Sequence, residues 1–438
     1  MSHFHDPAAG LRAGERGKVG RMALRYRDEK PASSKTKARF DRQAWLLLVV
    51  NGFFAVANAL SGTFVNVYMW KTKNDFALIG WFAFTAQLAG GLTFWLAGKW
   101  VKEHNKMNSL RLGVAVSALF YLLVLILQQR AVHYVILLGA VQGIAFGLFW
   151  LAFNVVYFEV TGPDNRDRFN GWAGLLGSLS GMVAPWVSGL LITRLGDTNG
   201  YRFVFAMSLG VFVAGAVFSF FLKKRKVPGV YDWLHGFKVI ASDGNPWRRV
   251  SLALVAQGIR EGVFGFMIAL LVYVATRNEW NVGNFSLLTS AVALVSYWLI
   301  GRLLKPAYRK WGMLVGAVMI VLVIVPFFWR INYATLLVFG VGVALFMPLY
   351  SIPMTSSVFD LIGKDERSAK LRVEYVVFRE LALTAGRMIG TLLFIAVVSR
   401  TTAPHAVSWL LLGIGSSPIA AWLLMKNRLA GVKWTESR

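Results

Sequence analysis

The sequence predicts an all-α membrane protein with 12 transmembrane helices in two pseudo-symmetric six-helix halves. An apolar composition, twelve long apolar runs and an internal repeat lead to this prediction. Of the 438 residues, 56% are hydrophobic and only 16% are charged, which is more apolar surface than a soluble domain can bury. Lipid therefore has to act as the solvent for much of the chain.

Each apolar run is long enough to cross a bilayer as a helix. A hydrocarbon core about 30 Å thick needs roughly 20 apolar residues, and a helix satisfies its own backbone hydrogen bonds in lipid. The predicted spans of the first half are 44–70, 76–98, 109–128, 133–158, 171–193 and 202–222. Those of the second half are 251–276, 284–302, 311–329, 332–359, 376–399 and 406–425.

Charge and connection length predict the boundaries of the domains. The longest internal connection, rich in Lys and Arg, separates the sixth span from the seventh. The predicted domains are a basic disordered cytoplasmic tail (1–43), the first half (44–222), a cytoplasmic linker (223–250), the second half (251–425) and a cytoplasmic tail (426–438).

A nine-residue segment occurs twice, at the ends of the fourth and tenth spans. Residues 158–166 read Phe-Glu-Val-Thr-Gly-Pro-Asp-Asn-Arg, and residues 359–367 read Phe-Asp-Leu-Ile-Gly-Lys-Asp-Glu-Arg. The repeat continues in the turns after the second and eighth spans, where Lys106 matches Arg309 and Gly113 matches Gly316. A duplicated unit packs against its copy, so the repeat predicts two similar halves.

The net charge of +26 follows the predicted topology. Most Lys and Arg residues lie in or beside the two tails and alternate loops, which the positive-inside rule places in the cytoplasm. We therefore expect a multi-pass protein of the cell membrane, with both termini cytoplasmic and no nucleic-acid partner. The chain contains no cysteine, which excludes thiol chemistry.

Three short motifs resemble those of the major facilitator superfamily. The turn Leu96-Ala97-Gly98-Lys99-Trp100-Val101-Lys102 is similar to the family's basic turn, with Gly98 where the family has aspartate. Gln142-Gly143 resembles the span 4 motif, although Gly139 takes the place of its arginine. In span 5 the small-residue pattern of drug antiporters matches Gly171, Ser180, Ala184, Pro185, Ser188 and Gly189.

The resemblance covers most of the chain and implies a bacterial transporter of the facilitator fold whose halves rock around a central site. It favours an antiporter-like subgroup with degenerate motifs. Close packing of small residues, which is common between membrane helices, is the alternative explanation of the span 5 pattern.

Charged side chains inside the seventh and eleventh spans predict the functional site. Each costs about 2.5–3.5 kcal/mol in the membrane, so each needs a use. Glu380, Thr384 and Arg387 share one helix face. We predict that Arg260, Glu261, Arg379, Glu380, Thr384 and Arg387 line a substrate or proton-coupling cavity. The alternative is a fixed salt-bridge network that joins spans 7 and 11.

The first half offers amides in place of these charges. We predict that Asn58, Asn66 and Asn154 form a neutral lining of the same cavity. Hydrogen bonding between helices, worth roughly 0.6 kcal/mol per bond, is the alternative role.

The repeated acids and basic turns predict a cytoplasmic gate. We expect Glu159 to bind the turn after span 8 and Asp360 to bind the turn after span 2, which would close that side. The proposed gate residues are Lys99, Lys102, Glu159, Asp164, Arg166, Arg302, Lys305, Asp360, Asp365 and Arg367.

No phosphate-binding loop and no metal-ligand cluster is found in the sequence, which argues against an enzyme. We expect no cofactor and no metal. The leading interpretation is a monomeric, proton-coupled exporter of amphipathic or drug-like small molecules, with protons and membrane lipids as further partners. A carrier or flippase for an anionic lipid or envelope precursor is the alternative, and a non-transporting sensor or scaffold is the alternative of another class.

Overall fold

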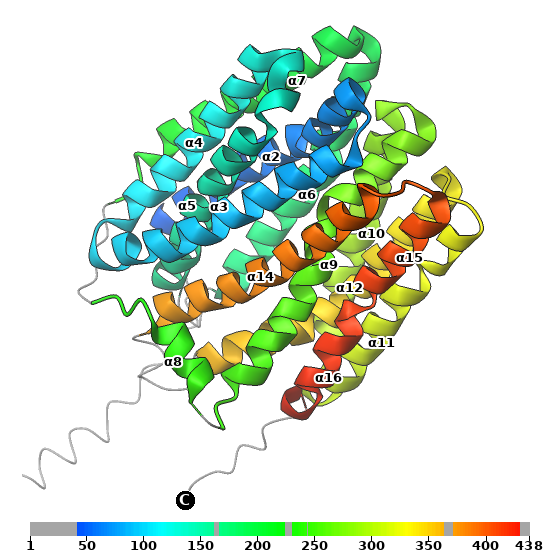
Figure 1. Cartoon of the computed structure of the whole chain (residues 1–438). Helices are drawn as coiled ribbons and strands as arrows, with labels where there is room; N and C mark the ends of the chain where they lie inside the picture. Colours follow the sequence, from blue (N-terminus) through cyan, green and yellow to red (C-terminus); the bar gives the residue numbers. More distant parts are fainter. Residues whose placement is uncertain (1–41, 162–165, 224–229, 243, 363–370, 430–438) are drawn as a thin grey trace, which may run out of the picture. The chain divides into compact units, whose positions relative to one another are not determined.

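The computed structural model describes residues 42–161, 166–223, 230–242, 244–362 and 371–429. Every regular element within these residues is a helix, as lipid requires of spanning segments. The helices pack as one bundle (Figure 1). Most of the predicted tails, 1–41 and 430–438, lies outside the described residues.

The first half contains six long helices and one short one. They are α2 (Arg42–Lys73), α3 (Phe76–Glu103), α4 (Lys106–Leu127), η1 (Gln128–Tyr134), α5 (Val135–Val160), α6 (Arg166–Leu195) and α7 (Asp197–Ser219). The linker contributes α8 (His235–Ala241), a helix that the sequence did not predict.

The second half repeats the plan. Its elements are α9 (Trp247–Thr276), α10 (Glu279–Leu303), η2 (Pro306–Tyr308), α11 (Arg309–Leu322), η3 (Val325–Phe328), α12 (Tyr333–Ile362), α14 (Arg372–Val398), α15 (Pro404–Gly415) and α16 (Ser417–Leu429).

Within the residues that the structure describes, helices account for all twelve predicted spans. Eleven stretches of the described residues are long and apolar enough to span a membrane, and one of them, Lys106–Tyr157, contains both α4 and α5. Two predicted spans are broken. The ninth ends as the short η3 around Pro326, and the twelfth divides between α15 and α16, where Pro418 stands in the first turn. Proline has no backbone N–H to donate and favours the start of a helix.

The repeat is visible in the local geometry of both halves. Asn74 and Arg277 both have positive φ, and the next residue in each turn, Asp75 or Asn278, caps the helix that follows. A side chain at Gly113 would stand 2.6 Å from the Phe149 nitrogen, and one at Gly316 would stand 2.6 Å from the Tyr350 nitrogen. The same close packing of neighbouring helices therefore occurs at matching positions of each half.

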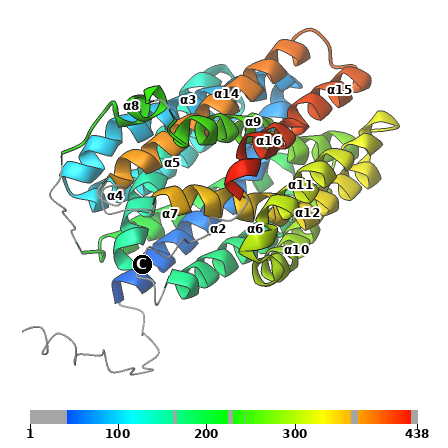
Figure 2. The ribbon, with the colours of Figure 1, turned by 90° about the horizontal axis from the view of Figure 1, so that it is seen from below.

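Two pairs of long helices join the halves. α3 packs along α14, and α6 packs along α10 (Figure 1). Because consecutive spans alternate in direction, α2 begins and α16 ends at the same end of the bundle. We call this the terminal end and the other the far end. Figures 1 and 2 both show α8 beside α14 near the terminal end.

The α6–α10 seam is closed at the far end and open at the terminal end. Side chains built at Gly181 and Gly189 of α6 would contact Ser290 and Glu279 of α10. Side chains built at Gly177, Gly174 and Gly171 would meet nothing within 4 Å. Because a helix has 3.6 residues per turn, these glycines lie on one side of α6, so the two helices separate toward the terminal end.

Candidate functional site

A cavity of about 560 Å³ is lined by the second half of the chain. Its charged residues are Arg260, Glu261 and Arg387. Aromatic, aliphatic and hydroxyl side chains form the rest of the wall, among them Phe264, Ile268, Phe285, Thr289, Ser290, Tyr297, Phe339, Val343 and Met347. The residues come from α9, α10, α12 and α14, and one of them, Ser290 of α10, donates to the Gly181 carbonyl of α6 at 3.2 Å, so the cavity borders the α6–α10 seam.

Arg387, on the wall of this cavity, is shared by two carboxylates: Glu261, which lines the cavity, and Glu380, which is not among the described lining residues although the sequence predicted it there. Arg387 of α14 donates from Nε and Nη2 to Glu261 Oε2 of α9 at 3.2 and 3.0 Å, and from Nη1 to Glu380 Oε1 at 2.6 Å. Gln257 donates to the other oxygen of Glu261 at 2.7 Å. We call Glu261, Glu380 and Arg387 the charge cluster.

Arg379 and Thr384, also predicted to line the cavity, are not among its described lining residues. Arg379 Nη1 is 3.8 Å from Glu380 Oε2, and the Arg379 guanidinium lies 5.6 Å from the centre of the Phe359 ring of α12. Thr384 does not line the cavity. Its methyl group packs against Gly91 of α3, because the face shared by Glu380, Thr384 and Arg387 turns partly toward the seam with the first half.

Arg260 lines the cavity without joining the charge cluster. Only 6% of the residue is exposed. Its guanidinium lies 4.7 Å from the centre of the Phe264 ring and 4.0 Å from the Met347 sulfur. Of the side chains that the structure describes, no carboxylate lies within salt-bridge distance of Arg260, and its Nε has no hydrogen-bond partner there. Arg260 is thus a buried cation held by an aromatic ring and a thioether.

Glycines place the charge cluster by bringing α9 and α14 together. Side chains at Gly258 and Gly262 of α9 would overlap the backbone of Leu383 and Arg387, and side chains at Gly386 and Gly390 of α14 would overlap the carbonyls of Val255 and Ile259. Small residues at this spacing allow such an approach in membranes. The close approach lets Glu261 reach Arg387 directly.

The predicted amides of the first half are absent from the described lining of this cavity. Asn58 donates to the Phe54 carbonyl of its own helix at 2.8 Å. Asn66 and Asn154 are half-buried, and Asn66 Oδ1 has no partner among the described residues. A side chain at Gly62, between Asn58 and Asn66, would meet nothing within 4 Å, so this stripe of α2 borders open space.

The predicted gate acids pair within their own halves. Glu159 forms a salt bridge with Lys106, and Asp360 pairs with Arg309 at 2.9 Å. These bases begin α4 and α11, whereas the sequence predicted partners in the opposite half. The terminal end is open here along the α6–α10 seam, so pairing across the halves stays a prediction for a closed state.

The other gate residues occupy separate places. Lys99 lies 4.0 Å from Glu103, the Arg302 guanidinium stacks 4.5 Å from the Trp298 ring, and Lys305 is exposed. Arg166 begins α6, but its side chain is outside the described residues, as are Asp164, Asp365 and Arg367.

The terminal end has a connection between the halves that the sequence did not predict. Lys102 of α3 forms a salt bridge with Glu374 of α14, which is almost fully buried. The linker lies over this pair. The Tyr231 backbone N–H donates to Glu103 at 3.0 Å, and the Asp232 backbone N–H donates to Glu374 at 3.3 Å. The linker therefore contacts both halves.

Aromatic contacts complete the attachment of the linker. Trp95 of α3 donates to the Trp233 carbonyl at 3.3 Å and contacts its ring. His235 packs edge-on against Tyr375 of α14 at 4.8 Å. Burial raises the pKa of the Tyr231 phenol and lowers the pKa of the His235 imidazole, the latter against the attraction of Glu374. The hydrogen bond from Lys238 lowers the pKa of Asp232.

The far end has its own ion pair between the halves. Lys71 of α2 lies 2.8 Å from Glu279 of α10, and the Tyr201 hydroxyl donates to the same carboxylate at 3.0 Å. Arg277 also lies 4.8 Å from the centre of the Trp70 ring. We call Lys71, Tyr201 and Glu279 the far-end latch. Their distance apart in the sequence left no local signal of the contact.

Local packing explains where the family-like motifs depart from their usual residues. A side chain at Gly139 would stand 2.6 Å from the Phe82 carbonyl of α3, which leaves no room for the arginine, whereas one at Gly98 would displace the Tyr231 hydroxyl. Of the span 5 residues, Gly171 borders open space. Ser180, Ala184 and Ser188 are buried, while Pro185 and Gly189 touch α10.

Comparisons with known proteins agree with this architecture. The family model described as Major Facilitator Superfamily matches residues 46–371. The "Uncharacterized protein YqgE" of Bacillus subtilis (strain 168) is 38% identical over 371 residues, which cover 84% of this chain and 86% of that protein. The "Uncharacterized protein in sodM 3'region" of Geobacillus stearothermophilus is 42% identical over 165 residues, or 38% of this chain and 77% of that one.

Solved transporters share the fold. A D-xylose-proton symporter superposes with a TM-score of 0.65 at 14% identity and covers 87% of this chain and 96% of its own. A bacterial homologue of the iron transporter ferroportin in its inward-facing state gives a TM-score of 0.61 at 16% identity, over 89% of this chain and 99% of its own. At such identities the likeness concerns the fold alone. The family match over residues 46–371 shows that this chain belongs to the major facilitator superfamily.

Proposed function

We propose that this chain is a secondary active transporter that works by alternating access and exports amphipathic small molecules in exchange for protons. The family supports the general class. The observation that supports proton coupling is that Arg387, on the wall of the cavity, is shared by Glu261 and Glu380. The protein acts in the cell membrane with its terminal end in the cytoplasm, as the distribution of basic residues favours.

The charge cluster offers a simple means of coupling. With both carboxylates ionised, Glu261 and Glu380 occupy the hydrogen-bond donors of Arg387, so its guanidinium is not available to a substrate. Protonation of Glu261 removes one of the two attractions, so Arg387 can move toward Glu380 or toward a bound molecule. A charge inside the membrane must keep a partner, and this requirement links the protonation of one carboxylate to the occupancy of the cavity.

The cavity wall suits an amphipathic substrate. Rings of Phe264, Phe285 and Phe339 provide apolar surface, while Thr289 and Tyr297 provide hydroxyl groups. Its volume of about 560 Å³ lies within the usual range for small-molecule sites, roughly 300–1,000 Å³. A substrate of this kind enters from the terminal end, where α6 and α10 separate.

Alternating access then requires the far end to open as the terminal end closes. Trp70 contacts Tyr273, and Lys71 binds Glu279, across the far end of α2, α9 and α10. These contacts would break in the outward-open state. The cross-half pairs expected for Glu159 and Asp360 would form at the same time.

Proteoliposomes that enclose a pH-sensitive dye test this proposal. Amphipathic fluorescent dyes are added, and dye movement and internal pH are followed together. Glu261→Gln and Glu380→Gln should abolish the proton movement while dye binding persists. Asp75→Asn is the matched control, because asparagine also caps a helix and Asp75 lies far from the charge cluster.

The outcome separates proton coupling from a structural latch. If Glu261→Gln moves dye and protons as the parent does, the carboxylate is not the coupling group. If both neutral variants unfold at lower temperature and lose dye binding, the charge cluster serves to hold α9 against α14. If no compound moves and all cluster substitutions are tolerated, the sensor or scaffold interpretation is favoured.

A carrier or flippase for an anionic lipid or envelope precursor is the second candidate, and Arg260 is the observation that favours it. This buried cation has a ring and a sulfur for neighbours, so an anionic head group would supply the missing partner. Arg260→Gln should abolish binding of an anionic amphiphile, and Arg260→Lys should keep part of it. Equal loss of cationic dye binding in Arg260→Gln would count against this candidate.

A further inference from the structure

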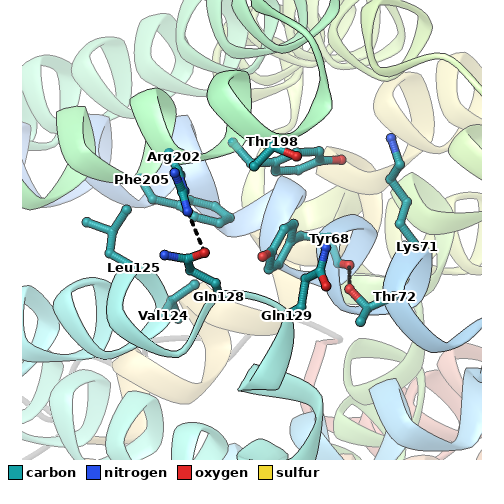
Figure 3. Close-up of a pocket in the computed structure, with 11 residues that line it drawn as sticks. Tyr68, Lys71, Thr72, Val124, Leu125, Gln128, Gln129, Thr198, Arg202 and Phe205 are labelled. Carbon is teal, nitrogen blue, oxygen red and sulfur yellow. Dashed lines mark hydrogen bonds between the residues drawn. The ribbon is translucent and has the colours of Figure 1, made fainter.

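A second cavity lies at the far end, within the first half of the chain. It encloses about 370 Å³ between α2, the end of α4, η1 and the start of α7 (Figure 3). We call it the far-end pocket. Its lining residues are Tyr68, Lys71, Thr72, Val124, Leu125, Gln128, Gln129, Thr198, Tyr201, Arg202 and Phe205. None of them belongs to the central cavity, so this pocket has a separate chemistry.

The lining is polar and positively charged. It contains two cations, Lys71 and Arg202, together with hydroxyl groups from two tyrosines and two threonines and the amides of two glutamines. Among the lining residues that the structure describes, none carries a carboxylate. Arginine and lysine with hydroxyl and amide donors are the groups that bind phosphate esters. Phe205 and the tyrosine rings add an apolar wall that an inorganic ion does not need.

The position of Arg202 depends on an unusual backbone conformation. Gln128 has φ 50°, although it is not glycine, and a non-glycine residue adopts such a conformation only where its surroundings hold it there. It follows α4 directly and accepts a hydrogen bond from Arg202 Nη2 (Figure 3). Of the side chains that the structure describes, no carboxylate lies within salt-bridge distance of Arg202. A neutral amide therefore holds the guanidinium at the pocket without neutralising it.

The second cation belongs to the pocket and to the far-end latch at once. Lys71 lines the pocket and binds Glu279 of the other half at 2.8 Å. Tyr201, another lining residue, donates to the same carboxylate. An anion in the pocket would attract Lys71 away from Glu279, because the two negative groups compete for one ammonium.

We infer that the far-end pocket binds a small organic anion that carries a phosphate group, and that this anion competes with Glu279 for Lys71. Arg202 binds the phosphate oxygens, and the hydroxyl and amide groups bind the rest of the molecule. Binding weakens the far-end latch and so favours separation of the halves at that end. The inference requires no transport activity, and its test measures binding alone.

Calorimetric titration of the purified full-length chain in detergent tests the site. The probe is glycerol 3-phosphate, with glycerol as the uncharged comparison. The parent should bind the phosphate ester and not glycerol. Arg202→Gln should lower the affinity about tenfold or more, since hydrogen bonds to charged groups are worth roughly 1.5–3 kcal/mol. Arg194→Gln, at the exposed end of α6 and outside the pocket, is the matched control and should bind as the parent does.

Competition with Glu279 gives a second test, in which a substitution is expected to raise the affinity for the phosphate ester instead of lowering it. Glu279→Gln should bind glycerol 3-phosphate several-fold more tightly than the parent, because Lys71 loses its internal partner. Lys71→Gln should bind more weakly. Thermal unfolding and size-exclusion profiles are compared first, so that misfolded variants are excluded. Unchanged affinity in a folded Glu279→Gln protein would overturn the competition, and unchanged affinity in Arg202→Gln would overturn the site.

Lipid composition identifies the source of the phosphate group. The titration is repeated in nanodiscs of phosphatidylcholine and in nanodiscs that contain phosphatidylglycerol. Weaker binding of the soluble ester in phosphatidylglycerol assigns the pocket to a lipid head group. Equal binding in both assigns it to a soluble phosphate ester. No binding in detergent or in either nanodisc would overturn the proposal.

Discussion

The two halves of the chain share a backbone plan and place different groups inside it. The far-end turns match: Asn74 and Arg277 both have positive φ, and Asp75 and Asn278 each cap the helix that follows. In the same register, Glu261 of α9 corresponds to Asn58 of α2. Asn58 forms a hydrogen bond within its own helix, whereas Glu261 forms a salt bridge with Arg387 on another helix. A neutral amide can be satisfied locally, but a charge within the membrane needs a partner that only tertiary packing can supply.

Removal of Arg387 should have the largest effect and would erase the difference between the halves. Arg387→Gln leaves Glu261 and Glu380 without their shared cation, which we expect to cost about 3 kcal/mol of stability and to abolish coupled transport. Thermal unfolding in detergent and the proteoliposome assay measure the two effects. In the first half, Asn58→Ala should cost less than about 1 kcal/mol. Similar stability losses in the two variants would contradict this account.

The two halves also differ in how deeply their matching ion pairs at the terminal end, Lys106–Glu159 and Arg309–Asp360, are buried. The Lys106 side chain is 2% exposed and its partner Glu159 21%, whereas Arg309 and Asp360 are 26% and 67% exposed. Lys106→Met should destabilise the protein by about 3 kcal/mol, because it leaves a carboxylate partly buried without its partner. Arg309→Met should cost less than about 1 kcal/mol. Chemical unfolding of both variants decides the matter, and equal losses would show that burial does not control these pairs.

A smaller effect is expected from the glycines that bring α9 against α14. In the register of α2, the positions of Gly258 and Gly262 are occupied by Ala55 and Ala59. Gly262→Ala would force α9 away from Arg387 and should cost about 1–3 kcal/mol. Gly265→Ala, where a side chain meets nothing within 4 Å, should be neutral or stabilise the helix by up to about 1 kcal/mol. If Gly262→Ala and Gly265→Ala changed the unfolding temperature equally, the close approach of α9 to α14 at Gly262 would be refuted.

The smallest effect is a pH dependence at the linker, which joins the halves. The lowered pKa of His235 means that the attached linker prefers the neutral imidazole. Above the ordinary pKa of 6.5 the ring is neutral whether or not the linker is attached. As the pH falls below that value, the detached linker takes up the proton more readily, so attachment weakens. Glu374 and Asp232 oppose this effect, and Lys102 and Lys238 add to it.

Hydrogen exchange across residues 231–241, corrected for the intrinsic pH dependence, measures this attachment. Protection should be lower at about pH 5.5 than at about pH 7.5, across the range where histidine titrates. His235→Gln should remove the difference, because glutamine has no charge to gain. Unchanged protection in the parent would show that His235 protonation does not act on the linker.

The sequence predicted the features that depend on local pattern. Hydropathy placed the twelve crossings, and the repeat pointed to the two halves. The i, i+7 spacing of Glu380 and Arg387 placed them on one face, where a hydrogen bond now joins them. These features follow from helix geometry, which is the same wherever the helix lies.

Contacts between distant segments could not be predicted in this way. Lys102 forms a salt bridge with Glu374, and Lys71 forms one with Glu279. Both pairs depend on how the halves face each other, and nothing near these residues in the sequence indicates it. The linker helix α8 was missed because its seven residues are too short for a clear apolar period. Lys106 was matched to Arg309, but its pairing with Glu159 required the packing of α4 on α5.

Because Tyr231 and Trp233 bind α3, the linker joins the two halves by noncovalent contacts as well as by the peptide chain. These residues precede α9, yet they bind the first half through Glu103 and Trp95. The second half thus carries its own peptide ligand for the first. A chain cut between residues 223 and 230 would keep that ligand on the second fragment, so two fragments expressed separately are expected to find each other and assemble in the membrane.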